Sequence, residues 1–167
     1  MSNYKPLIIK SEFRDYYKLS PNIGKDDELD NYIRKAQELK FKPTVNEDFY
    51  NDLIGSLTSR PELSDFLNNY IKPFLISATY ERFLLWHGNN INQFGIRQNL
   101  EDTSQQISTS NRSELINDVK SDSNAFLSLM NKGLKDAEYT FDGVVYDFGS
   151  CINKGRRNLI IRQLGKK

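Results

Sequence analysis

A helical stripe over residues 59–88 is the longest apolar pattern in this chain and constrains the fold most. Ser59 is placed to cap the helix, and Pro61 falls in the first turn, where a missing N–H is tolerated. The apolar residues then recur at the spacing of one helix face: Leu63, Phe66, Leu67, Tyr70, Ile71, Phe74, Leu75 and Ala78. A helix from Glu62 to His87, about 39 Å at about 1.5 Å per residue, would be the longest element. The stripe predicts a helical core.

Pro73 interrupts this stripe near its middle. Proline removes one backbone hydrogen bond and its ring clashes with the preceding turn. The sequence therefore predicts either one kinked helix or two helices that meet at Pro73. At the far end, His87 and Gly88 fit the last turn and the residue that follows it, where a cationic side chain and a glycine are expected for structural reasons alone.

Four further segments have helical patterns. The first surrounds Phe13, Tyr16 and Tyr17, with Ser11 as a possible N-cap. The second begins at about residue 26 and stops at Pro43, with an apolar stripe of Leu29, Tyr32, Ile33, Ala36 and Leu39. The third has Thr44 and Glu47 at capping-box spacing and ends near Gly55. The last covers residues 113–134, with Leu115, Val119, Phe126, Met130 and Leu134 on one side. With the stripe over residues 59–88, these patterns predict a mainly helical chain.

The segment YTFDGVVY, residues 139–146, follows a different pattern. Asp142-Gly143 between β-branched and aromatic residues is the strongest short hairpin signal. A lone two-stranded hairpin is marginal in water. We therefore expect it to pack on another subunit or on strands of an adjoining protein, with Phe141 and Val145 buried at that interface. The hairpin is then not part of the core of its own subunit. On this view Gly143→Val would impair assembly more than stability.

Residues 87–99, HGNNINQFGIRQN, contain the single histidine, several amides and one arginine. Amide side chains of this kind bond to backbone and tolerate left-handed conformations. The stretch reads as an ordered loop, followed by a polar, low-complexity loop over residues 101–113. We expect Asn90, Asn92, Arg97 and Asn99 to contact another subunit or ring, because the sequence offers them no local partner.

Charge divides the chain into an acidic body and a basic tail. Residues 151–167 carry no acid and six bases, among them Lys154, Arg156, Arg157 and Arg162, while residues 1–150 carry 17 bases and 22 acids, a net −5. The 167 residues fit one domain over 1–150, including the hairpin, plus this tail. The tail could bind nucleic acid or an acidic protein surface, or could simply be a solvated terminus.

Patterns for catalysis or for cofactors are weak. Cys151 and His87 could pair as nucleophile and base, but no catalytic motif surrounds either. The acids at residues 26–30 fit a helix start better than a metal site, and the glycine-containing turns lack a phosphate-binding pattern. One cysteine excludes an internal disulfide, and one histidine with it excludes a Cys/His zinc site. We expect no enzyme, no cofactor, no metal, no signal peptide, no membrane contact and a cytosolic site of synthesis.

The order of segments resembles a known family. LIIKSEFRDYYKLSPNI, DDELDNYIRKAQELKFKPTVNEDFYNDL, YIKPFLISATYERFLLW, NINQFGIRQN and SELINDV are similar to the head-tail connector proteins of tailed bacteriophages. Within these, the chain looks most like the neck-ring proteins of crAss-like phages. The helix LDNYIRKAQ leading to EDFYNDL, and the IKPFL helix ending in an asparagine-glycine loop, carry the likeness over residues 7–148.

The resemblance implies an all-α fold, a small bundle of four to five helices. It also implies a structural virion protein without catalytic residues. Such subunits form a homo-oligomeric ring, commonly a dodecamer, in the neck between capsid and tail, and are assembled in the host cytoplasm. They contact the portal protein on one side and an adjacent neck or tail protein on the other, and DNA passes through the channel without sequence-specific binding. The acidic body would suit a channel wall, since phosphate binding depends on Lys and Arg. The alternative is a non-catalytic nucleic-acid-binding protein that uses its basic tail.

Overall fold

The computed structural model describes residues 4–19, 26–55, 60–86, 89–92, 95–98, 109–136, 140–146 and 148. Its helices are α1 (Lys10–Tyr17), α2 (Asp26–Ala36), α3 (Glu47–Gly55), α4 (Pro61–Phe66), α5 (Lys72–Trp86) and α6 (Thr109–Asp136), with π turns η1 (Gln37–Phe41) and η4 (Leu67–Ile71) and the 3-10 turn η2 (Lys42–Thr44). Two hairpins complete it: β1 (Asn89–Asn92) with β2 (Gly95–Gln98), and β3 (Thr140–Phe141) with β4 (Val144–Val145). The predicted helical bundle with a long Pro-containing helix and a C-terminal hairpin is confirmed.

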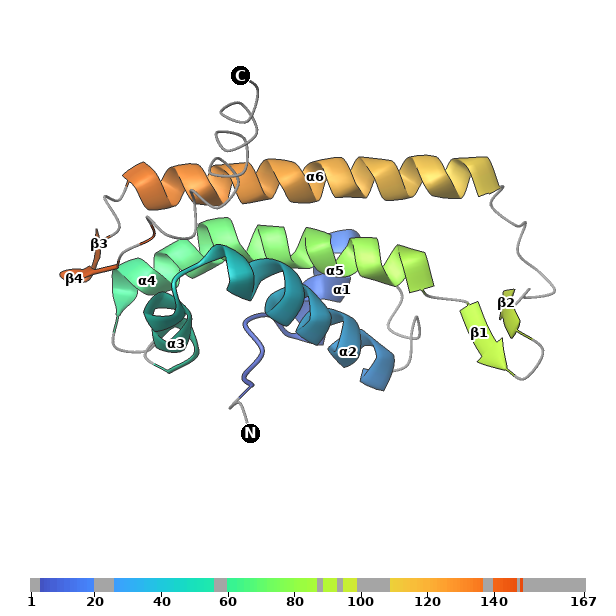
Figure 1. Ribbon diagram of the computed structural model, residues 1–167, viewed down its shortest axis with the longest axis horizontal. Helices are drawn as coiled ribbons and strands as arrows, with labels where there is room; N and C mark the ends of the chain where they lie inside the picture. Colours follow the sequence, from blue (N-terminus) through green and yellow to red (C-terminus); the bar gives the residue numbers. More distant parts are fainter. Residues whose placement is uncertain are drawn as a thin grey trace, which may run out of the picture.

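The molecule is elongated, and α5 runs through its middle. Helix α6 lies along one side of α4 and α5, while α2 and α3 cover the other side (Figure 1). Buried residues occur on every face of α5, including Phe74, Leu75, Ile76 and Ala78. A helix that is apolar all round must be surrounded by other elements, so α5 is the centre of the core.

Two π turns shift the phase of the helical stripes. Within η1 the backbone runs in wider turns, and the Lys42 N–H donates to the Gln37 carbonyl five residues earlier. The extra residue rotates the following side chains, so Gln37 and Phe41 are buried while Leu39 is 62% exposed. The predicted stripe through Leu39 is therefore wrong beyond Ala36, because it assumed a regular helical period.

The second π turn, η4, explains how the chain accommodates Pro73. The Lys72 N–H donates to the Leu67 carbonyl, again five residues back, and α5 begins at once. Helix α4, η4 and α5 therefore follow one another without a loop, as the one-helix alternative expected. At 28 residues α6 is longer than this run, since it already begins at Thr109. The prediction of a loop over residues 101–113 is wrong for its last five residues.

Two predicted helix caps also differ in the structure. The Oδ1 of Asn46 accepts the Asp48 N–H at 2.7 Å and caps α3, whereas the Thr44 hydroxyl donates to the Phe41 carbonyl. At α1 the N-cap is Ile9, whose N–H donates to the Glu12 carboxylate at 2.9 Å, and Ser11 lies inside the helix. Each cap was missed by two residues. At α3 several neighbouring polar side chains fit the same motif, and at α1 the N-cap is the apolar Ile9, which no capping preference indicates.

A buried glutamine joins the N-terminal segment to this body. Gln37 is fully buried: its Oε1 accepts the Leu7 N–H and its Nε2 donates to the Lys5 carbonyl, both at 2.9 Å. The same Nε2 donates to the Tyr50 hydroxyl, which donates to Glu38 at 2.7 Å. These bonds connect three separate segments, so the polar group is satisfied within the core.

Candidate assembly surfaces

The first candidate surface is the β1–β2 hairpin, which extends beyond the end of α5 and away from the helices (Figure 1). Its strands pair antiparallel, with Asn90 opposite Arg97 and Asn92 opposite Gly95. Among the described residues each strand pairs only with the other, so both outer edges of this sheet lack a neighbouring strand. Unpaired strand edges are templates for contact with another chain.

Three of the four residues predicted to contact another subunit in this stretch therefore share one hairpin. Asn90, Asn92 and Arg97 lie on its strands, while Asn99 is outside the described residues. The stretch was expected to be an ordered loop, and the hairpin corrects that expectation. Polar residues alternate there with Ile91 and Ile96, which gives a weak strand signal that the surrounding asparagines obscured.

The α5 residues directly before this hairpin expose apolar surface. Leu85 is 41% exposed and Trp86, the only tryptophan, is 52% exposed. One turn earlier, the Nε of Arg82 is buried and has no hydrogen-bond partner in the described part of the chain. We call these three residues the α5 surface. Tryptophan and arginine dominate the binding energy of many protein interfaces, so this composition favours contact with a protein.

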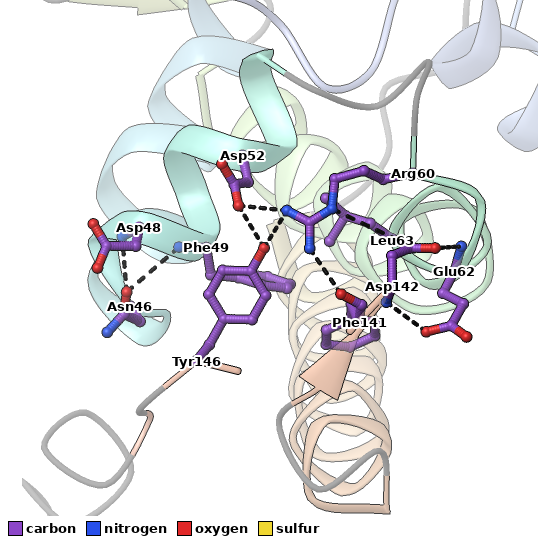
Figure 2. A network of polar contacts seen from close by, with 10 residues as sticks. All are labelled: Asn46, Asp48, Phe49, Asp52, Arg60, Glu62, Leu63, Phe141, Asp142 and Tyr146. Carbon is purple, nitrogen blue, oxygen red and sulfur yellow. Dashed lines mark hydrogen bonds and ion pairs between the residues drawn. The ribbon is translucent and has the colours of Figure 1, made fainter. Parts of the chain in front are cut away.

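At the opposite end, the β3–β4 hairpin is fixed to the body by one polar network, which we call the Arg60 cluster. It consists of Asp52 from α3, Arg60 and Glu62 at the start of α4, and Asp142 and Tyr146 from the hairpin segment (Figure 2). Arg60 is its centre: one Nη donates to Asp52 and to the Tyr146 hydroxyl, and the other donates to the Phe141 carbonyl at 2.8 Å.

Asp142 caps α4 from a distant part of the sequence. Its carboxylate accepts the N–H groups of Glu62 at 3.0 Å and Leu63 at 3.2 Å, and the Glu62 carboxylate accepts the Asp142 N–H at 2.6 Å. Asp142 and Gly143 have φ of 51° and 79°, the positive values that a tight hairpin turn requires. This reciprocal pair satisfies orphan donors at the helix start.

Tyr146 completes the cluster. Its hydroxyl donates to Asp52 at 2.5 Å and its side chain is buried. Burial raises the pKa of Tyr146 to about 12, and the hydrogen bond to Asp52 acts in the same direction. The phenol is therefore a neutral donor over the physiological range, with a structural role in this arrangement.

These contacts correct the prediction for the C-terminal hairpin. Phe141 is 3% exposed and packs on Phe49 and Phe66 of its own chain, with ring centroids 5.5 and 4.9 Å apart. The hairpin is thus part of the core, because helices α3 and α4 supply the neighbours that the sequence did not reveal. Val145, the other predicted interface residue, is 74% exposed and Val144 is 42% exposed. They remain accessible for an intermolecular contact.

A pocket of about 190 Å³ lies between the N-terminal segment, η1 and α3. Its lining includes Tyr4, Glu38, Lys42, Tyr50 and Asn51. Lys42 stands over the Tyr50 ring, 5.1 Å from its centroid, and burial raises the pKa of Tyr50 to about 12. The polar groups here bind one another, and the Tyr50–Glu38 pair is part of the Gln37 network. We interpret the pocket as a gap in the packing where these segments meet.

The positions weighed for chemistry lie elsewhere. His87, Cys151 and the basic-tail residues Lys154, Arg156, Arg157 and Arg162 are outside the described residues. Within the described ranges no three His, Cys, Asp or Glu side chains gather as a metal site would need. No helix in that part of the chain is sufficiently long and apolar to span a bilayer.

The sequence missed the residues that matter most to these surfaces. Arg60 was not selected from the sequence, and Asp52, Glu62 and Tyr146 match no local motif. Their partners are 80 or more residues away or lie on a different element. Only Asp142 stood out, and it did so as a turn residue.

Residues 35–147 match the model of a family of unknown function, DUF6712. No curated protein and no solved structure matches the chain.

Proposed function

Because the chain belongs to the DUF6712 family, whose function is unknown, we propose its role from its own features: it is a structural virion protein that forms a connector ring between portal and tail. In this role it extends the DNA channel and joins head to tail. The resemblance to phage head-tail connectors suggested the role, and the fold is compatible with the helical subunit that the resemblance implies.

The observation that carries the proposal is the projecting β1–β2 hairpin. Two strands of four residues each pair only with one another among the described residues and extend away from the helices (Figure 1). A lone two-stranded sheet is marginally stable in water and gains most from a neighbour. In a ring, a neighbouring subunit, the portal protein or the adjacent neck or tail protein would supply that neighbour through Asn90, Asn92 and Arg97.

The test is assembly of the full chain with a portal protein of a tailed phage. We expect electron microscopy of the mixture to show an added ring below the portal, and light scattering to give a multiple of the 19.4 kDa subunit mass. A variant with Gly-Ser repeats in place of residues 89–98 should keep its thermal unfolding temperature and lose the ring. A wild-type chain that neither binds portal nor forms a ring would refute the proposed function.

The basic tail supports the second candidate, a nucleic-acid-binding protein, because six bases without an acid are concentrated in residues 151–167. Titration of the full chain and of a variant lacking that tail with duplex DNA at several salt concentrations separates the two. Affinity that falls steeply with salt and depends on the tail, in a chain that does not assemble, would favour this candidate. Weak, salt-insensitive binding with intact assembly would support the ring.

A further inference from the structure

The two ends of this elongated subunit expose surfaces of complementary composition. One end carries the α5 surface, composed of Arg82, Leu85 and Trp86. The other end carries the hairpin surface, which we define as Asp65 of α4 with Val144 and Val145 of β4. The two surfaces lie at opposite ends of the long axis, since α5 ends beside β1–β2 and the β3–β4 hairpin lies at the start of α4 (Figure 1).

The hairpin surface combines exposed apolar and acidic groups. Val145 is 74% and Val144 42% exposed, although Phe141 of the same hairpin is buried. Asp65 is exposed one helical turn after Glu62, and Glu62 binds the hairpin turn through the Asp142 N–H. The Arg60 cluster fixes the hairpin turn to the start of α4, so this part of the surface is preformed rather than ordered on binding.

The segments that carry the two surfaces differ in net charge. Residues 82–98 contain Arg82 and Arg97 and no acid, a net +2. Residues 60–66 and 140–146 together contain one base, Arg60, and three acids, Glu62, Asp65 and Asp142, a net −2. The two segments therefore carry net charges of opposite sign, which favours contact between them over contact of either segment with its own copy.

We propose that the α5 surface of one copy docks against the hairpin surface of the next copy, so that this chain associates with itself head to tail. Trp86 and Leu85 cover Val144 and Val145, and Arg82 comes within reach of Asp65. A head-to-tail contact closes into a ring when its rotation allows. This inference rests on the proposed ring and identifies the surfaces that build it.

The test uses two full-length variants, each of which damages one end. Trp86→Glu places an acid in the α5 surface, and Val145→Glu places one in the hairpin surface. Both residues are at least half exposed, so we expect the folds and unfolding temperatures to stay close to wild type. Tyr16→Glu is the control, at a residue that is 50% exposed on α1 behind the middle of α5. If Trp86→Glu unfolds early, Trp86→Ser replaces it.

Sedimentation velocity of each variant and of their mixture then tests the contact. We expect wild type and Tyr16→Glu to form large assemblies, and each end variant alone to be monomeric, with its self-association weakened at least tenfold. In the mixture the intact hairpin surface of Trp86→Glu meets the intact α5 surface of Val145→Glu, so heterodimers should form. A contact of either surface with the same surface of another copy cannot give this rescue.

Several results would overturn the inference. These are a wild-type chain that stays monomeric at every concentration, either variant assembling like wild type, or a mixture that shows no heterodimer. Rings of either variant on the portal protein would refute the end-to-end contact and leave the proposed function standing. Heterodimers from a chain that does not bind portal protein would support the end-to-end contact and refute the proposed function.

Discussion

At the scale of single residues, Asp142 does more than form a turn. Its carboxylate caps α4 and lies 3.7 Å from the Arg60 Nε, while its backbone takes a φ of 51°. From the sequence, only the role of Asp142 in the turn can be recognised, because the helix start that it caps is 79 residues away.

We predict that Asp142→Gly lowers the free energy of unfolding by about 1–2 kcal/mol, because the helix start loses its cap while the positive φ remains unstrained. Asp142→Asn is the matched variant: it tolerates the same φ and retains one acceptor oxygen, so its loss should be smaller. Urea unfolding followed by circular dichroism measures both. Equal stability of wild type and the Gly variant would show that the cap contributes nothing.

At the scale of elements, the C-terminal hairpin belongs to the helical body. An intermolecular role was predicted because no further strand was available to widen this two-stranded sheet. The prediction did not consider that helices can supply the missing neighbours. Phe141, Tyr146 and Phe148 instead surround Phe49 of α3, with ring centroids 5.1–5.5 Å from it. The hairpin therefore stabilises the subunit whether or not it also binds a neighbour.

This changes what Gly143→Val should do. A Cβ at Gly143 would meet no atom within 4 Å, so the damage comes from φ of +79°, which a β-branched residue adopts only with strain. We predict a loss of about 1–3 kcal/mol in the isolated subunit, visible as a lower thermal unfolding temperature. Gly143→Asn, which tolerates positive φ, should retain most of the stability. An unchanged unfolding temperature with failed assembly would restore the earlier, purely intermolecular view.

Helix positions were predictable from the sequence, but helix phase was not. Periodicity identified each helix of the body, and Pro73, Pro43 and Gly55 were recognised as interruptions or ends. The period itself changes in η1 and η4, and no local composition marks that change. Leu39 was therefore placed inside and Gln37 was overlooked, although Gln37 holds the N-terminal segment in place.

The candidate surfaces were predictable in part. Asn90, Asn92, Arg97 and Val145 were chosen from composition, and the structure places the first three on one hairpin and leaves Val145 exposed. The Arg60 cluster and the α5 surface depend on which segments meet in space. That information is absent from a single sequence, since Arg82 and Trp86 look like ordinary members of a core helix there.

At the scale of the whole molecule, tyrosines that are buried or half-buried make the free energy of unfolding fall at alkaline pH. Burial raises the pKa of Tyr4, Tyr17, Tyr50 and Tyr146 to about 12, from 10 in the unfolded chain. A raised pKa means that the folded state favours the neutral phenol. The stability that these groups contribute is fully present below pH 10 and is lost as the pH rises through about 12.

We predict a fall in urea midpoint between about pH 10 and pH 12, measured with tyrosinate absorbance as a second probe. Tyr146→Phe should lower stability at neutral pH, because Arg60 and Asp52 lose a partner, and should reduce the slope above pH 10. If the urea midpoint of Tyr146→Phe falls as steeply above pH 10 as that of wild type, ionisation of Tyr146 does not contribute to unfolding.

The π turns also affect how relatives of this chain should be aligned. Each holds one more residue than an α-helical turn would, so a relative with a regular helix there would be one residue shorter and yet keep the same downstream face inward. Single-residue gaps within residues 37–41 or 67–71 would then be structurally sound, although gaps inside helices are normally penalised. An alignment that moves such a gap into a neighbouring loop would pair core positions with surface positions along the rest of the helix.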